Sequence, residues 1–194
     1  RDVAPSRGLG DVYKRQKISN KIDIAKKMPK QKEMGKVVSV SAGFDHVMAL
    51  NEDGELFIWG SDRMGQCQIP MEVKHEKIKQ IAAGYQISYV LTEGGEVIAW
   101  GNENLNDVRL TRRNGNSHIA KISVANTTLM ALTDDGEIRH LGSQKSDISN
   151  IPEDLGKAKD IVTTSDACVA LMEDGSLRCL LYTSPSPRDG ATSR

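Results

Sequence analysis

The 194-residue sequence has few aromatic residues, few cysteines and no net charge. Aromatic residues make up 4% of the chain and cysteines number three, which excludes a small disulfide-stapled domain. Basic and acidic residues number 26 each, which excludes a histone-like polycation. No apolar run approaches the roughly 20 residues that cross a bilayer, so we predict no membrane-spanning segment. The hydrophobic content of 38% is nevertheless enough for a packed core.

The two ends of the chain encode one DNA sequence read in opposite directions. A DNA sequence that encodes residues 1–16, read on its complementary strand one base out of frame, encodes residues 179–194 residue for residue. The repeated DNA resembles the end of a transposase-type sequencing adapter. We therefore interpret both segments as translated adapter that is not native and takes no part in the fold. Residues 17–178 are then expected to be an internal piece of a longer reading frame.

Charge and cysteine content bear on the partner and the compartment. The two ends hold six basic and three acidic residues, so the remainder has a net charge of −3. Such a chain lacks a broad basic surface, and nucleic acid is not expected as a partner. Cys67 and Cys168 are far apart and show no CxxC spacing, which favours ordinary apolar roles and a reducing compartment such as the cytoplasm.

The remaining sequence repeats with a period near forty residues. Four segments align through turn glycines at Gly54, Gly95, Gly136 and Gly175, which are 41, 41 and 39 residues apart. Each glycine lies between two short apolar runs, the signature of a β-hairpin, and another short apolar segment precedes each hairpin. None of these runs has the length or spacing of a helix. Each repeat therefore predicts at least three short strands, the composition of a β-propeller blade.

The motifs around these hairpins resemble the regulator of chromosome condensation repeat. The first copy carries the fullest pattern: Ala42-Gly43, His46, Ala49-Leu50, Asp53-Gly54, Trp59-Gly60, Gly65-Gln66 and Pro70. The second copy keeps Trp100-Gly101 but has Ile87 in place of the histidine, and the third has Leu141 in place of the tryptophan. The resemblance implies an all-β fold in which residues 37–178 form three blades and part of a fourth of a seven-bladed β-propeller.

Residues 17–36 precede the first recognisable repeat and are rich in lysine. They hold seven lysines and two acidic residues. Two interpretations stay open. The segment is either the diverged end of a preceding blade with a solvated connecting loop, or a basic patch that binds an acidic partner.

The repeats offer little for catalysis. The four histidines, His46, His75, His118 and His140, occupy unrelated repeat positions, so no metal-ligand spacing recurs. The acidic residues of the hairpins recur at one turn in every repeat, which turn geometry explains. Motifs of phosphate-binding loops, nucleophile elbows and zinc proteases are not found. We predict no catalytic residue, no cofactor and no metal site, and therefore a protein that is not an enzyme.

Three repeat residues are expected to hold the scaffold together. Trp59 and Trp100 occupy equivalent positions at the ends of equivalent strands, and we expect both to be core wedges between neighbouring blades. His46 is expected to make a hydrogen bond within its own blade, beside the turn at Gly43.

The stretch between the second and third repeats is the most individual part of the chain. Residues 102–118 replace the Gly-Gln connection of the first copy and carry Arg109, Arg112 and Arg113. Binding sites are commonly found on loops that depart from a repeat consensus. We therefore predict that these three arginines contact a partner protein.

The family resemblance sets expectations for that partner. It implies protein recognition through loops on one face of the propeller, and family members include guanine-nucleotide exchange factors for a small GTPase. Other members are modules inside ubiquitin ligases. A protein-binding scaffold or regulator whose partner is a small GTPase is thus one expectation. The alternative is a substrate-recruiting arm of a larger enzyme such as a ubiquitin ligase.

Overall fold

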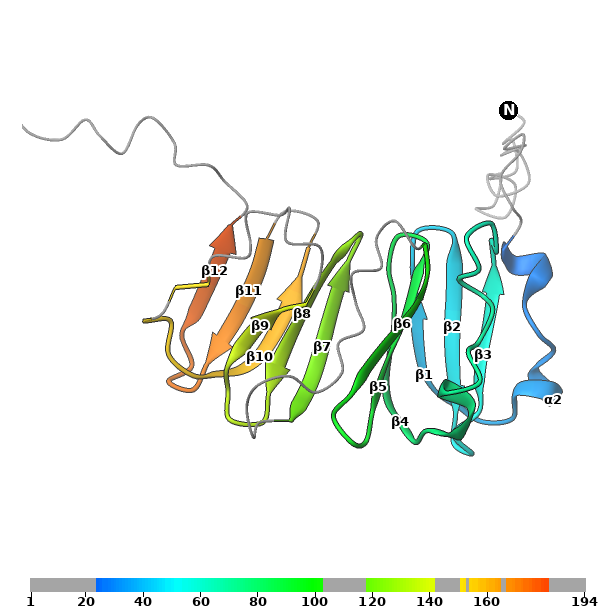
Figure 1. Ribbon diagram of the computed structural model, residues 1–194, viewed down its shortest axis with the longest axis horizontal. Helices are drawn as coiled ribbons and strands as arrows, with labels where there is room; N and C mark the ends of the chain where they lie inside the picture. Colours follow the sequence, from blue (N-terminus) through cyan, green and yellow to red (C-terminus); the bar gives the residue numbers. More distant parts are fainter. Residues whose placement is uncertain (1–23, 103–117, 142–150, 153, 165–166, 182–194) are drawn as a thin grey trace, which may run out of the picture.

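Four small antiparallel sheets stand side by side in the computed structural model (Figure 1). Each sheet has three strands, and strands that follow one another in the sequence are neighbours in the sheet. The sheets follow one another in chain order, so each is one propeller blade, as the repeat predicts. The structure describes residues 24–102, 118–141, 151–152, 154–164 and 167–181.

The strand bounds follow the sequence repeat. The blades are blade 1 with β1 (Val37–Ala42), β2 (His46–Asn51) and β3 (Leu56–Gly60), blade 2 with β4 (Ile78–Ala83), β5 (Ile87–Thr92) and β6 (Val97–Gly101), blade 3 with β7 (Ile119–Ala125), β8 (Thr128–Thr133) and β9 (Ile138–His140), and blade 4 with β10 (Ala158–Thr163), β11 (Ala167–Met172) and β12 (Leu177–Leu181). The described residues also form three short helical turns: η1 (Ile24–Lys27), α2 (Gln31–Met34) and η2 (Val73–His75). None of the helical turns in the described ranges is long and apolar enough to cross a membrane.

The acidic hairpins form for local reasons. In blade 1 the side-chain oxygen of Asn51 accepts hydrogen bonds from the backbone N–H groups of Asp53, at 3.1 Å, and Glu55, at 2.7 Å. Gly54 has a φ of +82°, which glycine adopts without strain. Thr92 plays the part of Asn51 in blade 2, because its hydroxyl oxygen accepts from the N–H of Glu96 at 3.1 Å. The hairpins predicted from the glycine spacing are thus confirmed.

The hydrophobic core lies between blades rather than within them. Met48 and Leu50 of blade 1 pack with Ile81 and Val90 of blade 2, and comparable clusters join blade 2 to blade 3 and blade 3 to blade 4. The alternation of side chains along a strand explains this arrangement. A three-stranded sheet buries one face against the preceding blade and the other against the next.

The innermost strands of neighbouring blades are joined by side-chain hydrogen bonds. The hydroxyl oxygen of Ser41 on β1 accepts from the N–H of Ala83 on β4, at 2.9 Å. The same bond recurs between blades 3 and 4, where the hydroxyl oxygen of Ser123 on β7 accepts from the N–H of Thr163 on β10, at 2.8 Å. These bonds satisfy N–H groups at strand edges that have no partner within their own sheet.

The segment before β1 is built like the connection that enters blade 2. In each case a proline is followed by a helical turn, Pro29 by α2 and Pro70 by η2. Each turn places one buried apolar side chain against the sheet, with Met34 2% and Val73 1% exposed. Lys27, Lys30, Lys32 and Lys36 lie at the surface, and Lys36 pairs with Glu52 at 2.8 Å.

Strand β12 runs into the C-terminal segment that we expected to lie outside the fold. Val169 lies opposite Cys179 and Cys168 opposite Leu180, and Leu180 packs on the core between blades 3 and 4. A β-ladder requires backbone N–H and C=O groups and an apolar side chain on the buried face, whatever the origin of the residues. The expectation is therefore wrong for 179–181, whereas residues 1–16 and 182–194 lie outside the described residues.

Candidate partner-binding face

The turns between the first two strands of blades 1 to 3 form one face of the molecule, which we call the turn face. Their central residues are Phe44-Asp45, Tyr85-Gln86 and Asn126-Thr127. Backbone hydrogen bonds join neighbouring turns, from the N–H of Phe44 to the carbonyl of Gly84 at 3.2 Å and from the N–H of Tyr85 to the carbonyl of Asn126 at 2.7 Å. The turns are therefore held in fixed positions relative to one another.

Two aromatic rings meet on this face. The ring centroids of Phe44 and Tyr85 are 4.8 Å apart, with an angle of 49° between the planes. Phe44 is 69% exposed, although burial of a phenylalanine is normally favourable. Our sequence reasoning missed this pair. The signal was present, because an aromatic residue follows the turn glycine at Gly43 and again at Gly84.

The predicted arginine contacts lie outside the described residues, but the structure shows where their segment begins and ends. Arg109, Arg112 and Arg113 fall between Asn102 and His118, the last and first described residues on either side. The amide nitrogen of Asn102 donates to the side-chain oxygen of Gln86 on the turn face, at 3.2 Å. The last described residue before the segment thus contacts the turn face, whereas the first one after it, His118, lies at a hairpin of the opposite face, with its Nδ1 3.2 Å from the carbonyl oxygen of Gly94.

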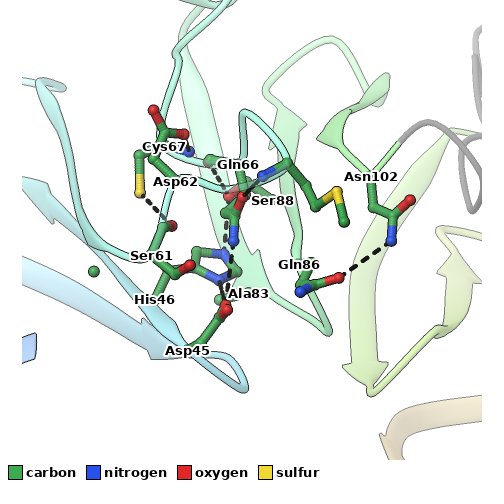
Figure 2. A network of polar contacts seen from close by, with 12 residues as sticks. Asp45, His46, Ser61, Asp62, Gln66, Cys67, Ala83, Gln86, Ser88 and Asn102 are labelled. Carbon is green, nitrogen blue, oxygen red and sulfur yellow. Dashed lines mark hydrogen bonds and ion pairs between the residues drawn. The ribbon is translucent and has the colours of Figure 1, made fainter. Parts of the chain in front are cut away.

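A buried polar network joins blades 1 and 2 beneath the turn face (Figure 2). The Nε2 atom of His46 lies 3.0 Å from the Oγ of Ser88 on β5, and both side chains are fully buried. The Ser88 hydroxyl donates to the carbonyl of Gln66 at 2.8 Å, and the indole N–H of Trp100 donates to the same carbonyl at 3.1 Å. Because the Ser88 proton is used there, His46 donates from Nε2.

The hydrogen bond of His46 therefore crosses to the next blade, and our expectation of a bond within blade 1 is wrong. The predicted place of His46 beside the turn at Gly43 is confirmed, because a Cβ built on Gly43 would lie 2.9 Å from Cε1 of the His46 ring. Residue spacing alone does not show which face of β2 a side chain occupies. The buried face here is the one that blade 2 covers.

Gln66 holds the start of the β3–β4 connection against the turn face. Its side-chain nitrogen donates to Oδ1 of Asp45 at 3.2 Å, and its side-chain oxygen accepts from the N–H of Met64 at 2.9 Å. With its carbonyl bound by Ser88 and Trp100, this one buried residue contacts the turn, the connection and both blades. This explains why the repeat motif carries a Gly-Gln pair.

Asp45, His46 and Ser88 lie in an order that superficially resembles a nucleophilic triad. Oδ1 of Asp45 is 3.6 Å from Nδ1 of His46, and the hydroxyl of Ser88 is on the other side of the ring. Catalysis would need an exposed hydroxyl whose proton passes to an unprotonated Nε2. Here Ser88 is fully buried and its proton is donated to Gln66. The geometry makes this group a structural link between blades.

Burial sets the charge state of this link. Desolvation lowers the pKa of His46, and the neighbouring carboxylate of Asp45 only partly offsets the effect. His46 is thus a neutral, buried donor.

Within the described ranges, no group of three or more His, Cys, Asp or Glu side chains is arranged to hold a metal ion.

The lowered pKa of His46 predicts that the protein loses stability in mild acid. The unfolded chain takes up a proton on this residue near its ordinary pKa of 6.5, whereas the folded chain resists it. The contribution is fully present above that pH and is lost as the pH falls below it. We expect urea denaturation to show a lower free energy of unfolding at pH 5.5 than at pH 7.5.

The His46→Gln variant should lose less stability over the same pH interval, since glutamine does not titrate. Partial burial also lowers the pKa of His140, so His140→Gln is the comparison at a half-buried histidine. An equal pH dependence in the parent and in the His46→Gln variant would contradict the assignment.

The two equivalent tryptophans differ in their surroundings. Trp100 is 6% exposed and packs in the core between blades 1 and 2, as expected of a wedge. Trp59 is only half-buried, because it belongs to blade 1, before which the structure describes no further blade. The expectation of a buried wedge is therefore confirmed for Trp100 and wrong for Trp59.

The opposite face carries the acidic hairpins and a shallow groove. The groove has a volume of about 620 Å³ and lies between residues 52–56 and residues 73–78. Its rim includes Glu52, which pairs with Lys36. This surface is the second candidate for contact with a partner. The turn face is favoured because it carries the exposed ring of Phe44 stacked on the half-buried ring of Tyr85.

Comparisons with known proteins agree with this architecture. A profile of the regulator of chromosome condensation (RCC1) repeat matches residues 37–66 and 78–106, which are the first and second repeats. The matched residues include both the Gly-Gln pair and the aromatic pair of the turn face. No curated protein matches the chain as a relative.

Solved structures of three proteins share the fold. Prp20p from Saccharomyces cerevisiae, described with its binding to Gsp1p and histones, is 19% identical with a TM-score of 0.59, over 74% of this chain and 44% of its own. The ectodomain of the Physcomitrella patens receptor kinase CR4 is 17% identical with a TM-score of 0.61, over 78% and 42%. Human WBSCR16 is 18% identical with a TM-score of 0.60, over 74% and 46%. The chain thus spans less than half the length of these proteins.

Proposed function

We propose that this chain, whose first two repeats match the regulator of chromosome condensation repeat, is a protein-binding module with no catalytic activity of its own. Its partner docks on the turn face. The observation that carries this proposal is the exposed ring of Phe44 on the half-buried ring of Tyr85, held on turns that are themselves fixed by hydrogen bonds between blades.

Aromatic side chains on a rigid support are suited to recognition. Binding energy at protein interfaces concentrates in a few residues, in which tyrosine, tryptophan and arginine are enriched. Phe44 and Tyr85 present apolar surface whose ordering requires little further loss of conformational freedom, because their turns are bonded to neighbouring backbone. Arg109, Arg112 and Arg113 follow Asn102, which binds Gln86 on this face, and we propose that they add charged contacts to the same partner.

The partner that we propose to test first is a small GTPase. Supporting this choice, Prp20p shares the fold and binds Gsp1p. A second role, as the recruiting arm of a larger enzyme, is favoured by the likeness to the ectodomain of a receptor kinase, in which the same fold is one part of a multidomain chain. Both roles use the propeller to bind protein and differ in what the partner is.

Replacing Arg109, Arg112 and Arg113 together with alanine is expected to weaken partner binding about tenfold or more, a loss of ~1.4 kcal/mol or greater. The melting temperature should not change, because the repeat residues and not these side chains hold the scaffold. Binding of immobilised full-length chain to purified Gsp1p and to purified histones measures the effect, and Phe44→Ala should weaken the same complex.

Met71→Ala is the matched control, because Met71 is also exposed and apolar, at 64%, but lies on the connection just before η2. It should bind as the parent does. If both the arginine and the Phe44 variants bind with parental affinity, the turn face is not the interface. Failure of Gsp1p to bind the parent at all would remove the small GTPase from the proposal.

A further inference from the structure

The groove on the face opposite the turn face lies where blades 1 and 2 meet. One wall is the hairpin of blade 1, residues 52–56, and the other is the connection that enters blade 2, residues 73–78. Glu93 on the hairpin of blade 2 extends the second wall, because its N–H donates to the carbonyl of Lys77 at 2.8 Å. The volume of about 620 Å³ lies within the roughly 300–1,000 Å³ that is usual for ligand sites.

The buried part of the groove is apolar. Its floor is formed by Leu56, Ile69, Val73 and Ile78. Val73 belongs to the core between blades 1 and 2, and the other three are partly buried and pack on that core. Covering apolar surface that remains in contact with water is favourable. The floor is therefore suited to apolar side chains of a binding partner.

The rim of the groove is predominantly acidic. Every ionisable residue on the wall of blade 1 is a carboxylate: Glu52, Asp53 and Glu55. The opposite wall holds two lysines and two glutamates: Lys74, Lys77, Glu76 and Glu93. The groove thus has five carboxylates and two lysines, and its negative charge is concentrated on the hairpin of blade 1.

Three of the five carboxylates have no cationic partner among the described residues. Glu52 pairs with Lys36 at 2.8 Å, and Glu55 accepts from the side-chain nitrogen of Asn51 at 3.0 Å. The remaining three form no ion pair with a described residue: Asp53, Glu76 and Glu93. An exposed ion pair contributes little free energy, so these charges select the sign of a partner while the floor provides most of the affinity.

We propose that the groove binds an extended segment of a partner protein in which apolar residues alternate with lysine or arginine. Successive side chains of an extended chain point to opposite sides. The apolar ones enter the floor, and the long basic ones between them reach the carboxylates of the rim. Charge complementarity identifies this occupant. The groove and the turn face are on opposite sides of the blades, so the inference does not depend on the proposed function.

Fluorescence anisotropy tests the proposal, with the full chain titrated into a short, capped and labelled peptide of alternating leucine and lysine. The parent should bind this peptide about tenfold or more tightly than a peptide of alternating leucine and glutamate. A peptide of alternating serine and lysine should also bind about tenfold or more weakly. The first comparison measures the charge of the rim and the second the apolar floor.

Glu93→Lys tests where the peptide binds. Glu93 is exposed, so the variant should keep the circular dichroism of the parent and weaken binding of the leucine–lysine peptide about threefold or more. Glu173→Lys is the matched control, because Glu173 occupies the same hairpin position in blade 4, is also exposed and donates its N–H to the carbonyl of Lys157 at 3.0 Å. It should bind as the parent does, and so should Phe44→Ala on the turn face.

Any of five results would overturn the proposal. The first is a parent that does not bind the leucine–lysine peptide, and the second is equal binding of the serine–lysine peptide. Equal losses in Glu93→Lys and Glu173→Lys would show attraction to the overall charge and not to the groove. Loss of binding in Phe44→Ala would assign the peptide to the turn face. A parent that sediments as a dimer, which Glu93→Lys dissociates, would make a second copy the occupant.

Discussion

Replacing Trp100 with alanine is expected to lower the free energy of unfolding by about 3–5 kcal/mol, the cost of removing a large buried aromatic. Trp100 is 6% exposed, packs among Ile81, Val90 and Met48, and donates its indole N–H to Gln66. Removing it leaves a cavity between blades 1 and 2 and takes one donor from a buried carbonyl. Because a domain is stable by only about 5–15 kcal/mol, this change should come close to unfolding the chain.

The equivalent change at Trp59 is the matched control. Trp59 is half-buried in blade 1, so Trp59→Ala should cost clearly less than Trp100→Ala. Urea denaturation followed by far-ultraviolet circular dichroism measures both variants without relying on the fluorescence of the residue removed. Equal losses would mean that the two tryptophans occupy equivalent environments, contrary to the structure.

Gly101→Ala is expected to destabilise the protein by about 3 kcal/mol, from backbone strain and a collision together. Gly101 has a φ of +121°, a conformation that residues with a side chain rarely adopt. A Cβ at this position would lie 2.4 Å from the carbonyl oxygen of Gln86 and 3.2 Å from Cβ of Gln66. The first contact is with backbone, which cannot rotate away, so the turn face itself would have to shift.

Gly54→Ala separates the strain from the collision. Gly54 also has a positive φ, of +82°, but a Cβ there would meet no atom within 4 Å. It should cost only about 1–2 kcal/mol, the price of the left-handed backbone alone. Thermal and urea denaturation of the two variants measure the difference. A Gly101→Ala variant as stable as Gly54→Ala would show that the close approach at Gln86 is not required.

Much of the fold could be predicted because its elements depend on short stretches of sequence. The hairpin at Gly54 is closed by the side chain of Asn51, three residues away, and by a glycine in a conformation that favours glycine. Such a unit can be recognised wherever it recurs. The aromatic pair could also have been found, since Phe44 and Tyr85 follow the turn glycine in consecutive repeats.

The contacts of the candidate site could be predicted only in part, because they join different repeats. The bond from His46 to Ser88 links residues 42 positions apart, and Ser88 occupies a position with no feature of its own in the repeat. The role of Gln66 as the common acceptor is likewise set by side chains that reach it from blade 2.

By itself, the sequence determined the four repeats, the strands of each blade and the turns that join them, because these follow from side-chain alternation and turn chemistry over a few residues. Only the tertiary structure decided which equivalent residues are buried. Val40 and Ile81, or Trp59 and Trp100, occupy the same repeat position and differ in exposure because one member of each pair faces a neighbouring blade. It also decided that β12 continues to Leu181, since a strand edge pairs with whatever backbone follows it. Burial in a repeat fold depends on the neighbour, and a repeat motif does not encode whether a neighbour is there.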